Sequence, residues 1–427
     1  MRTMTIRVWV FLLTACVGLT VSASEVRAQG TTVAIGGALQ DGNDALWGHL
    51  VQLVQPAAGP DERACYSVVT MASAEPEATF ARVAANLARH GGRTQHLRVG
   101  PRMEGQTNAR QLFAAMAAPG TLAELGHCRG VYMSGGAQAR LIDALQPQGR
   151  ATPLLQAMRA LWRAGGVVAG SSAGAAVLSE VVFRDAPDPL AVMKGRLREG
   201  AEWDRGFGFT PSGLVVDQHA VRRGRVARLL PLMQAQGATL GVAVEENSAA
   251  QFQGQEVLAL GARGLLIADL GSATSVPGSP FNVQGATLHW LESGDRFDLA
   301  TRSVKPSAAK VAATLLRPLD PAHRGYLRGD WFYADMLGDG VIVTAMTRLV
   351  DGDQRELRGL AFAARPAADD PSPDLAFEWR LWLDEATRGW LVTSPESYTL
   401  SGVRLDIVPM QLQRPFVRPL SSAARPP

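Results

Sequence analysis

The sequence predicts an α/β protein built on a doubly wound, mainly parallel sheet. The first observation is a set of short apolar segments, at residues 32–35, 66–71, 131–133 and 167–169, each followed by small residues. Strands that are apolar throughout are typical of a parallel sheet that is covered on both faces. The second observation is that helical patterns separate these segments. In such a sheet, ligands gather at the loops that follow the carboxyl ends of the strands.

The segments between the predicted strands have the periodicity of amphipathic helices. Within residues 77–90, apolar side chains recur at intervals of three and four, at Phe80, Val83, Ala84, Leu87 and Ala88. This spacing lines one face of a helix, which would cover the sheet. Residues 153–164 form a second such segment.

The second half of the chain has a different pattern, with more strand-like segments and turns than the first half. Strand-like segments punctuated by turns run through 241–244, 261–270 and 286–290, and a polar stretch follows at 301–310. We interpret 301–310 as a linker between a first domain, residues 29–300, and a C-terminal α+β accessory region, residues 311–415, whose role the sequence leaves open. We expect a helix to begin near residues 308–316 and strands at 341–347 and 402–408. The proline-rich tail, residues 416–427, is predicted to be disordered.

The N-terminus has the three parts of a secretory signal. Arg2 and Arg7 accompany an apolar run, and Val26-Arg27-Ala28 resembles a cleavage site. We predict that residues 1–28 are a signal peptide and that the mature chain is exported to the periplasm or the medium, with no stable membrane span. A membrane anchor is the weaker alternative, because the apolar run is short and interrupted. Residues 13–16, Leu-Thr-Ala-Cys, also resemble a lipobox, which would make Cys16 the lipidated end of an outer-membrane lipoprotein.

Composition and cysteine content exclude several classes of function. The 427 residues are 47% hydrophobic with a formal charge of +3, so nucleic-acid binding gains no support. If the signal peptide is removed, Cys65 and Cys128 are the two cysteines left, and they can pair in an oxidising compartment, although the sequence does not demonstrate the bond. The chain has no Cys-x-x-Cys, His-Glu-x-x-His or EF-hand pattern. We therefore expect no metal site and no cofactor.

A turn of small residues at 170–175 is the first candidate for catalysis. The predicted strand before it ends at Gly170, and Ser172 then starts a helix pattern at Ala173. A serine at such a strained strand-to-helix turn can act as a nucleophile, and the N–H group of Ala173 can face a developing oxyanion. Ser171 is the competing nucleophile, one residue early. The alternative reading is a glycine-rich packing turn or a phosphate-binding loop.

A second turn, residues 133–138, follows another predicted strand. Gly135 and Gly136 allow close approach of the backbone to a ligand and can supply a second oxyanion donor, and the amide of Gln138 can hold a substrate. Taken alone, this segment is better read as a plain turn.

The segment 214–230 brings a histidine together with acidic and basic residues. Asp217 and His219 are two apart at a predicted strand end, so their side chains point the same way. Four arginines follow within seven positions, at 222, 223, 225 and 228. They form either a solvated basic face or a site for substrate carboxylates.

The segment 240–249 ends an apolar strand with two adjacent acids, Glu245 and Glu246. Adjacent residues of a strand point to opposite faces, so one carboxylate can turn toward the carboxyl edge of the sheet. In isolation, glutamates at a strand end are more often surface residues.

Together, these four segments resemble one family. GGAQ (135–138), GSSAGA (170–175), DQHAVRRGRVARLL (217–230) and GVAVEENSA (241–249), in this order and at these separations, are similar to the cyanophycinase branch of the serine peptidases related to aspartyl dipeptidase E. The resemblance runs from about residue 31 to residue 299 and implies a flavodoxin-like fold of the class I glutamine amidotransferase type. Two departures are Ser171, where relatives commonly have threonine, and Ala137, where they often have an acid.

The resemblance assigns expected roles to individual residues. It implies a catalytic triad of Ser172, His219 as general base and Glu246 as the acid that orients it. Asp217 competes for the third role because it lies close to His219 in the sequence. Oxyanion donors would be the N–H groups of Ala173, Gly135 and Gly136. The implied substrate-binding residues are Gln138, Asp217, Gln218, Arg223, Arg225 and Arg228.

The implied activity is hydrolysis of cyanophycin, multi-L-arginyl-poly-L-aspartate, to β-Asp-Arg dipeptides by an exopeptidase-like serine enzyme. The first alternative is an exported peptidase of the same group that acts on other aspartyl or isoaspartyl peptides. The second is a non-catalytic protein that binds peptides or the polymer. An amidotransferase is less favoured, because neither Cys65 nor Cys128 lies in a suitable turn. The sequence leaves open whether the chain forms a homodimer.

Overall fold

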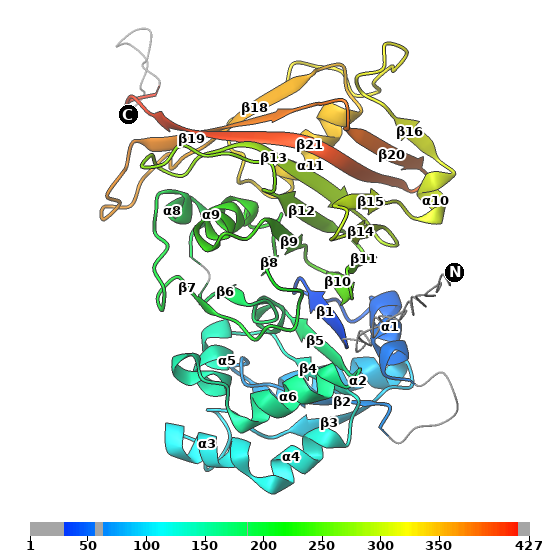
Figure 1. Cartoon of the computed structure of the whole chain (residues 1–427), viewed down its shortest axis with the longest axis vertical. Helices are drawn as coiled ribbons and strands as arrows, with labels where there is room; N and C mark the ends of the chain where they lie inside the picture. Colours follow the sequence, from blue (N-terminus) through cyan, green and yellow to red (C-terminus); the bar gives the residue numbers. More distant parts are fainter. Residues whose placement is uncertain (1–29, 56–62, 186, 417–427) are drawn as a thin grey trace, which may run out of the picture.

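The computed structural model describes residues 30–55, 63–185 and 187–416. Two large sheets, of nine and ten strands, are stacked along the long axis of the molecule (Figure 1). The predicted signal peptide, with Cys16, and residues 417–427 of the predicted tail lie outside the described residues. In the part of the chain that is described, no helix is long and apolar enough to cross a membrane.

The first sheet contains the predicted parallel strands. Its order is β15-β14-β11-β10-β1-β5-β4-β2-β3, and β1, β5, β4, β2 and β3 pair in parallel. The parallel strands are β1 (Thr31–Ile35), β2 (Cys65–Val69), β3 (Arg93–Leu97), β4 (Gly130–Met133) and β5 (Val167–Ser171). The antiparallel strands are β10 (Ser248–Gln253), β11 (Glu256–Gly261), β14 (Arg296–Asp298) and β15 (Ser303–Lys305).

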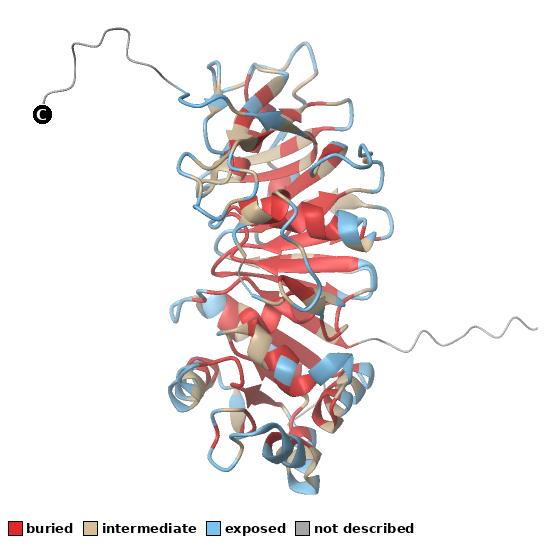
Figure 2. Ribbon diagram, turned by 90° about the vertical axis from the view of Figure 1, so that its left-hand side faces the viewer, coloured by how far each residue is buried: buried red, intermediate tan, exposed pale blue. Residues whose placement is uncertain are grey.

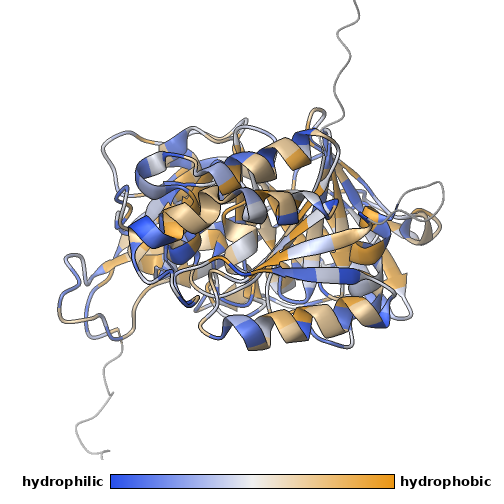
Figure 3. Cartoon of the chain, turned by 90° about the horizontal axis from the view of Figure 1, so that it is seen from below, coloured by the Kyte–Doolittle hydropathy of each residue, from blue (hydrophilic) through white to orange (hydrophobic). Residues whose placement is uncertain are grey.

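Helices pack on both faces of the parallel strands because alternate strand residues point to opposite sides. Val33 and Ile35 pack in one cluster with α1 (Asp44–Val54) and α2 (Pro76–Arg89), whereas Ala34 belongs to another. That second cluster includes side chains of α3 (Ala109–Ala117), α4 (Pro119–Gly126), α5 (Gln138–Leu145) and α6 (Pro153–Arg163). Seen from below, the strands lie between helices that carry both apolar and polar residues (Figure 3).

The second sheet joins the middle of the chain to its C-terminal part. Its order is β17-β18-β19-β21-β13-β12-β9-β8, with β20 beside β21 and β16 beside β20. Its strands are β8 (Leu214–Gln218), β9 (Leu240–Val244), β12 (Leu265–Asp269), β13 (Val283–Leu291), β16 (Thr314–Leu316), β17 (Phe332–Tyr333), β18 (Glu356–Ala361), β19 (Leu375–Trp382), β20 (Arg388–Thr393) and β21 (Glu396–Gln411). The parallel pair β8 and β9 is connected by α9 (Val226–Gln236).

The C-terminal region shares its core with the preceding strands. Because β21 pairs with β13, Leu288 and Leu405 lie in one apolar cluster with Trp379, and buried residues run through both stacked sheets (Figure 2). The stretch predicted as a linker, 301–310, contains β15 and the start of α10 (Ala308–Val311). The structure therefore has regular elements at that boundary, and independent folding of the two parts stays a prediction.

One predicted strand is wrong. Residues 341–347 lie in α11 (Val341–Val350). The segment begins with β-branched residues, which favoured a strand, but Ile342, Ala345, Met346 and Leu349 are buried at helical spacing against the second sheet. Packing of this face outweighs the β propensity.

Shorter elements complete the chain around the ends of these strands. They are the 3-10 helix η1 (Pro147–Gly149), α7 (Ala173–Ala176), α8 (Pro189–Met193) and the antiparallel pair of β6 (Val181–Phe183) with β7 (Trp203–Arg205).

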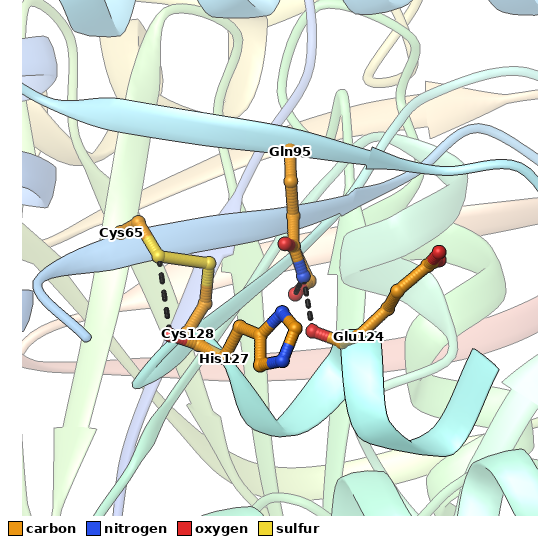
Figure 4. The surroundings of a disulfide bond; sticks show 6 residues. Cys65, Gln95, Glu124, His127 and Cys128 are labelled. Atoms are coloured by element: carbon orange, nitrogen blue, oxygen red, sulfur yellow. Dashed lines mark hydrogen bonds between the residues drawn. A yellow bond between two sulfur atoms is a disulfide. The ribbon is translucent and has the colours of Figure 1, made fainter. Parts of the chain in front are cut away.

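The structure contains a disulfide between Cys65 and Cys128, the pair whose bonding the sequence left open (Figure 4). Cys65 begins β2, Cys128 lies just before β4, and these strands are neighbours, which brings the two Cα atoms to 4.8 Å. The side chain of Gln95 on β3 donates a hydrogen bond to the carbonyl oxygen of Glu124 in α4. The end of α4 is thereby attached to two adjacent strands.

Candidate active site

Three loops that carry candidate catalytic residues meet at the end of β1. The backbone N–H of Ser172 donates to the carbonyl of Ile35, that of His219 to Gly36, and that of Asn247 to Gly37, each at 2.9 Å. These loops follow β5 of the first sheet and β8 and β9 of the second. The sequence predicted one sheet, but the site lies where two sheets meet, and residues 35–37 connect them.

The side chains of Ser172, His219 and Glu246 form a continuous chain of contacts. The Ser172 Oγ lies 2.9 Å from His219 Nε2, and His219 Nδ1 lies 2.6 Å from Glu246 Oε1. His219 and Glu246 are 6% and 7% exposed, so the pair is shielded from water. A nucleophile, a base and an acid that orients the base are the parts that a serine hydrolase requires.

The backbone is strained at Ser172, at His219 and at the residue that follows Glu246. Ser172, His219 and Asn247 have φ angles of 52°, 51° and 58°, which residues with side chains rarely adopt. Such strain persists only where the surrounding structure imposes it, and it concentrates at functional sites. At the turn before Ser172, a Cβ at Gly170 would lie 2.1 Å from the carbonyl oxygen of Gly174, so glycine is required.

Burial and nearby charges set the protonation states of the pair. Burial lowers the pKa of His219, with the charges of Arg223 and Arg225 acting in the same direction and Glu246 opposing. For Glu246, burial acts to raise the pKa, but the hydrogen bond with His219 and the charges of Arg222 and Arg223 outweigh it and lower the pKa. At neutral pH the imidazole is therefore neutral and the carboxylate ionised, as a general base and its partner require.

The predicted oxyanion donors lie close to Ser172. A Cβ at Gly135 would lie 3.2 Å from the Cβ of Ser172 and 3.8 Å from its Oγ. The N–H groups of Gly135 and Gly136 donate to no carbonyl within the described ranges, whereas those of Ser134 and Ala137 on either side are paired. Ala173 begins α7, directly after Ser172. This arrangement leaves backbone donors beside the hydroxyl.

Five of the six predicted substrate-binding residues are buried in internal contacts. Asp217 and Arg228, 1% and 0% exposed, form a two-bond ion pair of 2.6 and 2.7 Å. Arg225 donates to the side-chain and backbone oxygens of Gln218 at 2.8 and 2.9 Å. Gln138 donates to the carbonyls of Phe183 and Asp185.

Arg223 is the exposed member of that predicted set, and its guanidinium lies 3.7 Å from Glu246. Its neighbour Arg222, which was noted but not assigned a role, lies closer, at 3.2 Å from Glu246 Oε2. The competitor for the third role, Asp217, faces Arg228 and not His219. The competing nucleophile, Ser171, is buried at the end of β5.

Several residues of the site were not assigned from the sequence. A Cβ at Gly37 would lie 2.4 Å from His219 Nε2, so this glycine permits the position of the ring. Glu245 Oε2 accepts the N–H groups of Val221 and Arg222 at 2.7 and 3.0 Å and so holds the loop after His219. The double glycine after the first predicted strand was the available signal for Gly37. The contacts of Glu245 depend on the tertiary fold, and no sequence pattern indicated them.

A cavity of about 210 Å³ reaches Ser172 from the side of α1 and α2, and we call it the Ser172 cavity. Arg82 of α2 lines it, together with Trp47 and Tyr132. Its location beside the hydroxyl makes it a candidate for binding part of a substrate.

Comparisons with known proteins identify the family. Residues 69–260 match the model of peptidase family S51. The chain is 31% identical over 289 residues to the cyanophycinases of Synechococcus elongatus and Thermosynechococcus vestitus, with 65% of this chain and 81% of each relative covered. A solved peptidase from an acI-B1 Actinobacterium aligns with a TM-score of 0.44 and 19% identity over 64% of this chain and 98% of that one. The matches to the family model and to the cyanophycinases show that this chain belongs to peptidase family S51 and is a serine peptidase.

Proposed function

We propose that this peptidase hydrolyses cyanophycin, using Ser172 as nucleophile, His219 as general base and Glu246 as the acid that orients the base. The observation that supports the proposal most strongly is the contact chain from the Ser172 Oγ through His219 to Glu246, with separations of 2.9 and 2.6 Å. It occurs in a chain whose curated relatives are named cyanophycinases.

In the proposed acylation step, His219 Nε2 takes the proton of the Ser172 hydroxyl while Oγ attacks the carbonyl carbon of a backbone peptide bond. The oxyanion that forms accepts hydrogen bonds from the N–H groups of Ala173 and the 135–136 turn. The carbon–nitrogen bond then breaks, and His219 returns the proton to the leaving amine. The acyl group is left as an ester on Ser172.

Deacylation repeats the sequence with water as nucleophile. His219 takes a proton from the water, the hydroxide adds to the ester carbon, and Ser172 leaves with the proton that His219 returns. Glu246 stays ionised throughout and keeps the Nδ1 proton of His219 in place, in line with the lowered pKa of Glu246.

The proposed substrate is a backbone of aspartate residues that carry arginine on their β-carboxyl groups, and the proposed product is the β-Asp-Arg dipeptide. In this assignment, the half-exposed Arg222 and Arg223, which also pair with Glu246, meet substrate carboxylates at the rim of the site with their remaining N–H groups. The buried pairs Asp217–Arg228 and Gln218–Arg225 support the strand end that carries His219 and do not touch substrate directly.

We also propose that the fold is of the doubly wound class I glutamine amidotransferase type and that the mature chain is exported. The parallel order β1-β5-β4-β2-β3 with helices on both faces favours this fold. A disulfide between Cys65 and Cys128 favours an oxidising compartment. An enzyme in that location would degrade polymer from outside the cytoplasm.

The decisive experiment incubates the purified protein with insoluble cyanophycin and, separately, with isoaspartyl dipeptides. The proposal predicts that the polymer clears and that β-Asp-Arg accumulates. Cleavage of dipeptides with intact polymer would instead favour a peptidase for other aspartyl peptides.

A further inference from the structure

The Ser172 cavity has one cationic side chain and no acidic one. Among the described residues that line it, Arg82 is the only arginine, and none is aspartate, glutamate, lysine or histidine. No lining residue comes from the arginine-rich segment 217–230. The cavity is thus a separate feature from that segment. Its cation, Arg82, forms an ion pair with Asp41, which does not line the cavity, and an anionic group is the ligand that its remaining N–H groups fit.

Arg82 is held in place by the loop between β1 and α1. Its Nε donates to Asp41 Oδ1 at 2.7 Å, and its Nη2 donates to the carbonyl oxygen of Leu39 at 2.6 Å. A guanidinium has five N–H groups in a fixed plane, and Nη1 has no acceptor in the ranges that the structure describes. Arg82 is therefore oriented by two contacts and keeps donors for a ligand.

The other walls of the cavity are largely apolar. Trp47 and Tyr132 are each 2% exposed, and their rings stack with centroids 6.3 Å apart. The loop between β1 and α1 is also held to the Glu246 loop, since Asn247, next to Glu246, accepts hydrogen bonds from Gln40 and Asn43. The Arg82 side chain itself is exposed, and a carboxylate bound against these walls would exclude water from it, which strengthens a charged contact.

We propose that the Ser172 cavity binds a free carboxylate of the substrate and that Arg82 is the residue that recognises it. The proposal rests on the proposed function, because Ser172 must be the reacting group for the cavity to lie beside the scissile bond. In cyanophycin each arginine is attached through its amine, so its own carboxylate is free. A peptide with a free aspartyl carboxylate offers the same chemistry.

Binding to a Ser172→Ala protein tests this without turnover. The ligands are two synthetic β-Asp-Arg oligomers, one with free arginine carboxylates and one with these groups amidated, measured by titration calorimetry. We expect the free form to bind about 10 to 100 times more tightly, the range for a charge-assisted pair. Adding Arg82→Gln should reduce that preference to about twofold or less.

Two further variants separate recognition from support of the loop. Arg82→Lys keeps the charge and should keep part of the preference. Arg89→Gln is the matched control, because Arg89 lies on the same helix and donates to the backbone of Asp41 but does not line the cavity. It should keep the full preference. Thermal denaturation of each variant reports whether the loop stays folded.

Different results would overturn the role of Arg82 and the proposed substrate. No preference in Ser172→Ala, or a preference that survives Arg82→Gln, would overturn the role of Arg82 even if the wild type clears cyanophycin. A preference that depends on Arg82, in a protein that leaves cyanophycin intact, would support the carboxylate site and contradict the proposed substrate. Isoaspartyl dipeptides with free or amidated C-termini then show which carboxylate the cavity takes.

Discussion

Replacing Glu246 by glutamine removes one negative charge and almost no volume. In the structure, Glu246 Oε1 accepts from His219 Nδ1, and Oε2 lies 3.2 Å from the guanidinium of Arg222. An amide has only one oxygen. The nearer guanidinium, that of Arg222, lies 3.2 Å from Oε2, whereas that of Arg223 lies 3.7 Å from Oε1. Because a guanidinium can only donate, the oxygen of the introduced amide should turn toward Arg222 and its NH₂ group toward His219.

That orientation forces His219 into the wrong tautomer. An NH₂ group facing Nδ1 leaves that nitrogen as an acceptor, so the proton moves to Nε2, which then cannot accept the proton of Ser172. The loss of kcat expected for a misassigned tautomer in a serine triad is about 10³ to 10⁴, equivalent to about 4 to 5.5 kcal/mol of barrier. KM should change little.

The assay is steady-state hydrolysis of a soluble β-Asp-Arg oligomer, with Glu245→Gln as matched control. Glu245 carries the same charge one residue earlier, and its role is to accept two backbone N–H groups, which an amide oxygen can still do. We expect that variant to lose less than about tenfold, because a neutral acceptor retains most of such contacts. Equal losses of kcat in both variants, or a Glu246→Gln enzyme with a kcat near that of the wild type, would show that Glu246 does not set the tautomer of His219.

Four other results are expected. The kcat/KM of the wild type should fall as the pH drops through the pKa of His219. Because burial lowers that pKa, the midpoint of the fall should lie at a pH below the ordinary histidine range, and a midpoint above that range would contradict a neutral His219 as the base. Asp217→Asn should leave Arg228 buried without its partner and lower the free energy of unfolding by about 3 to 5 kcal/mol in a urea titration. A shift in the acid limb of the pH dependence of kcat/KM would instead indicate that Asp217 contacts His219. Gly37→Ala should push the His219 ring aside and reduce kcat about 100-fold with KM nearly constant, and an unimpaired enzyme would mean that the ring relaxes. Replacing Cys65 and Cys128 by serine opens a loop with a sequence separation of 63 and should lower the free energy of unfolding by about 4 kcal/mol. Activity at 25 °C is the control that the variant still folds, and an unchanged free energy of unfolding would count against the disulfide.

The sequence was informative where a local pattern is enough. The apolar segments ending in small residues correctly predicted β1, β2, β4 and β5, because strands buried on both faces must be apolar throughout. The turn around Ser172 was visible for the same reason, since a strained turn between a strand and a helix requires small residues. These features depend on neighbours within a few positions.

Most of the features that the sequence did not predict depend on contacts between different helices, strands and loops. Arg82 lies 90 positions before Ser172 in the sequence and reaches the cavity only because α2 packs beside the loop after β1. The pairing of Asp217 with Arg228 is another case. Both residues looked available for substrate, but α9 turns the arginine back under the strand. The helix α11 was read as a strand because propensity was weighed above the spacing of its apolar side chains.

The division of the chain into two sheets also lay beyond local patterns. The segments that carry His219 and Glu246 were expected at the edge of the same sheet as Ser172, whereas β8 and β9 pair with β12 in the second sheet. The three residues converge because the backbone of 35–37 binds all three loops. Such a junction is a property of tertiary hydrogen bonding and has no sequence period.

The most direct test of Ser172 as the nucleophile compares Ser172→Ala with Ser171→Ala in the release of β-Asp-Arg from cyanophycin. The two serines are adjacent, but the Ser172 Oγ is the one in contact with His219. We expect Ser172→Ala to lower kcat by about 10⁶ and Ser171→Ala to lower it far less. Near-normal release by the Ser172→Ala protein would contradict the assignment of Ser172 as the nucleophile.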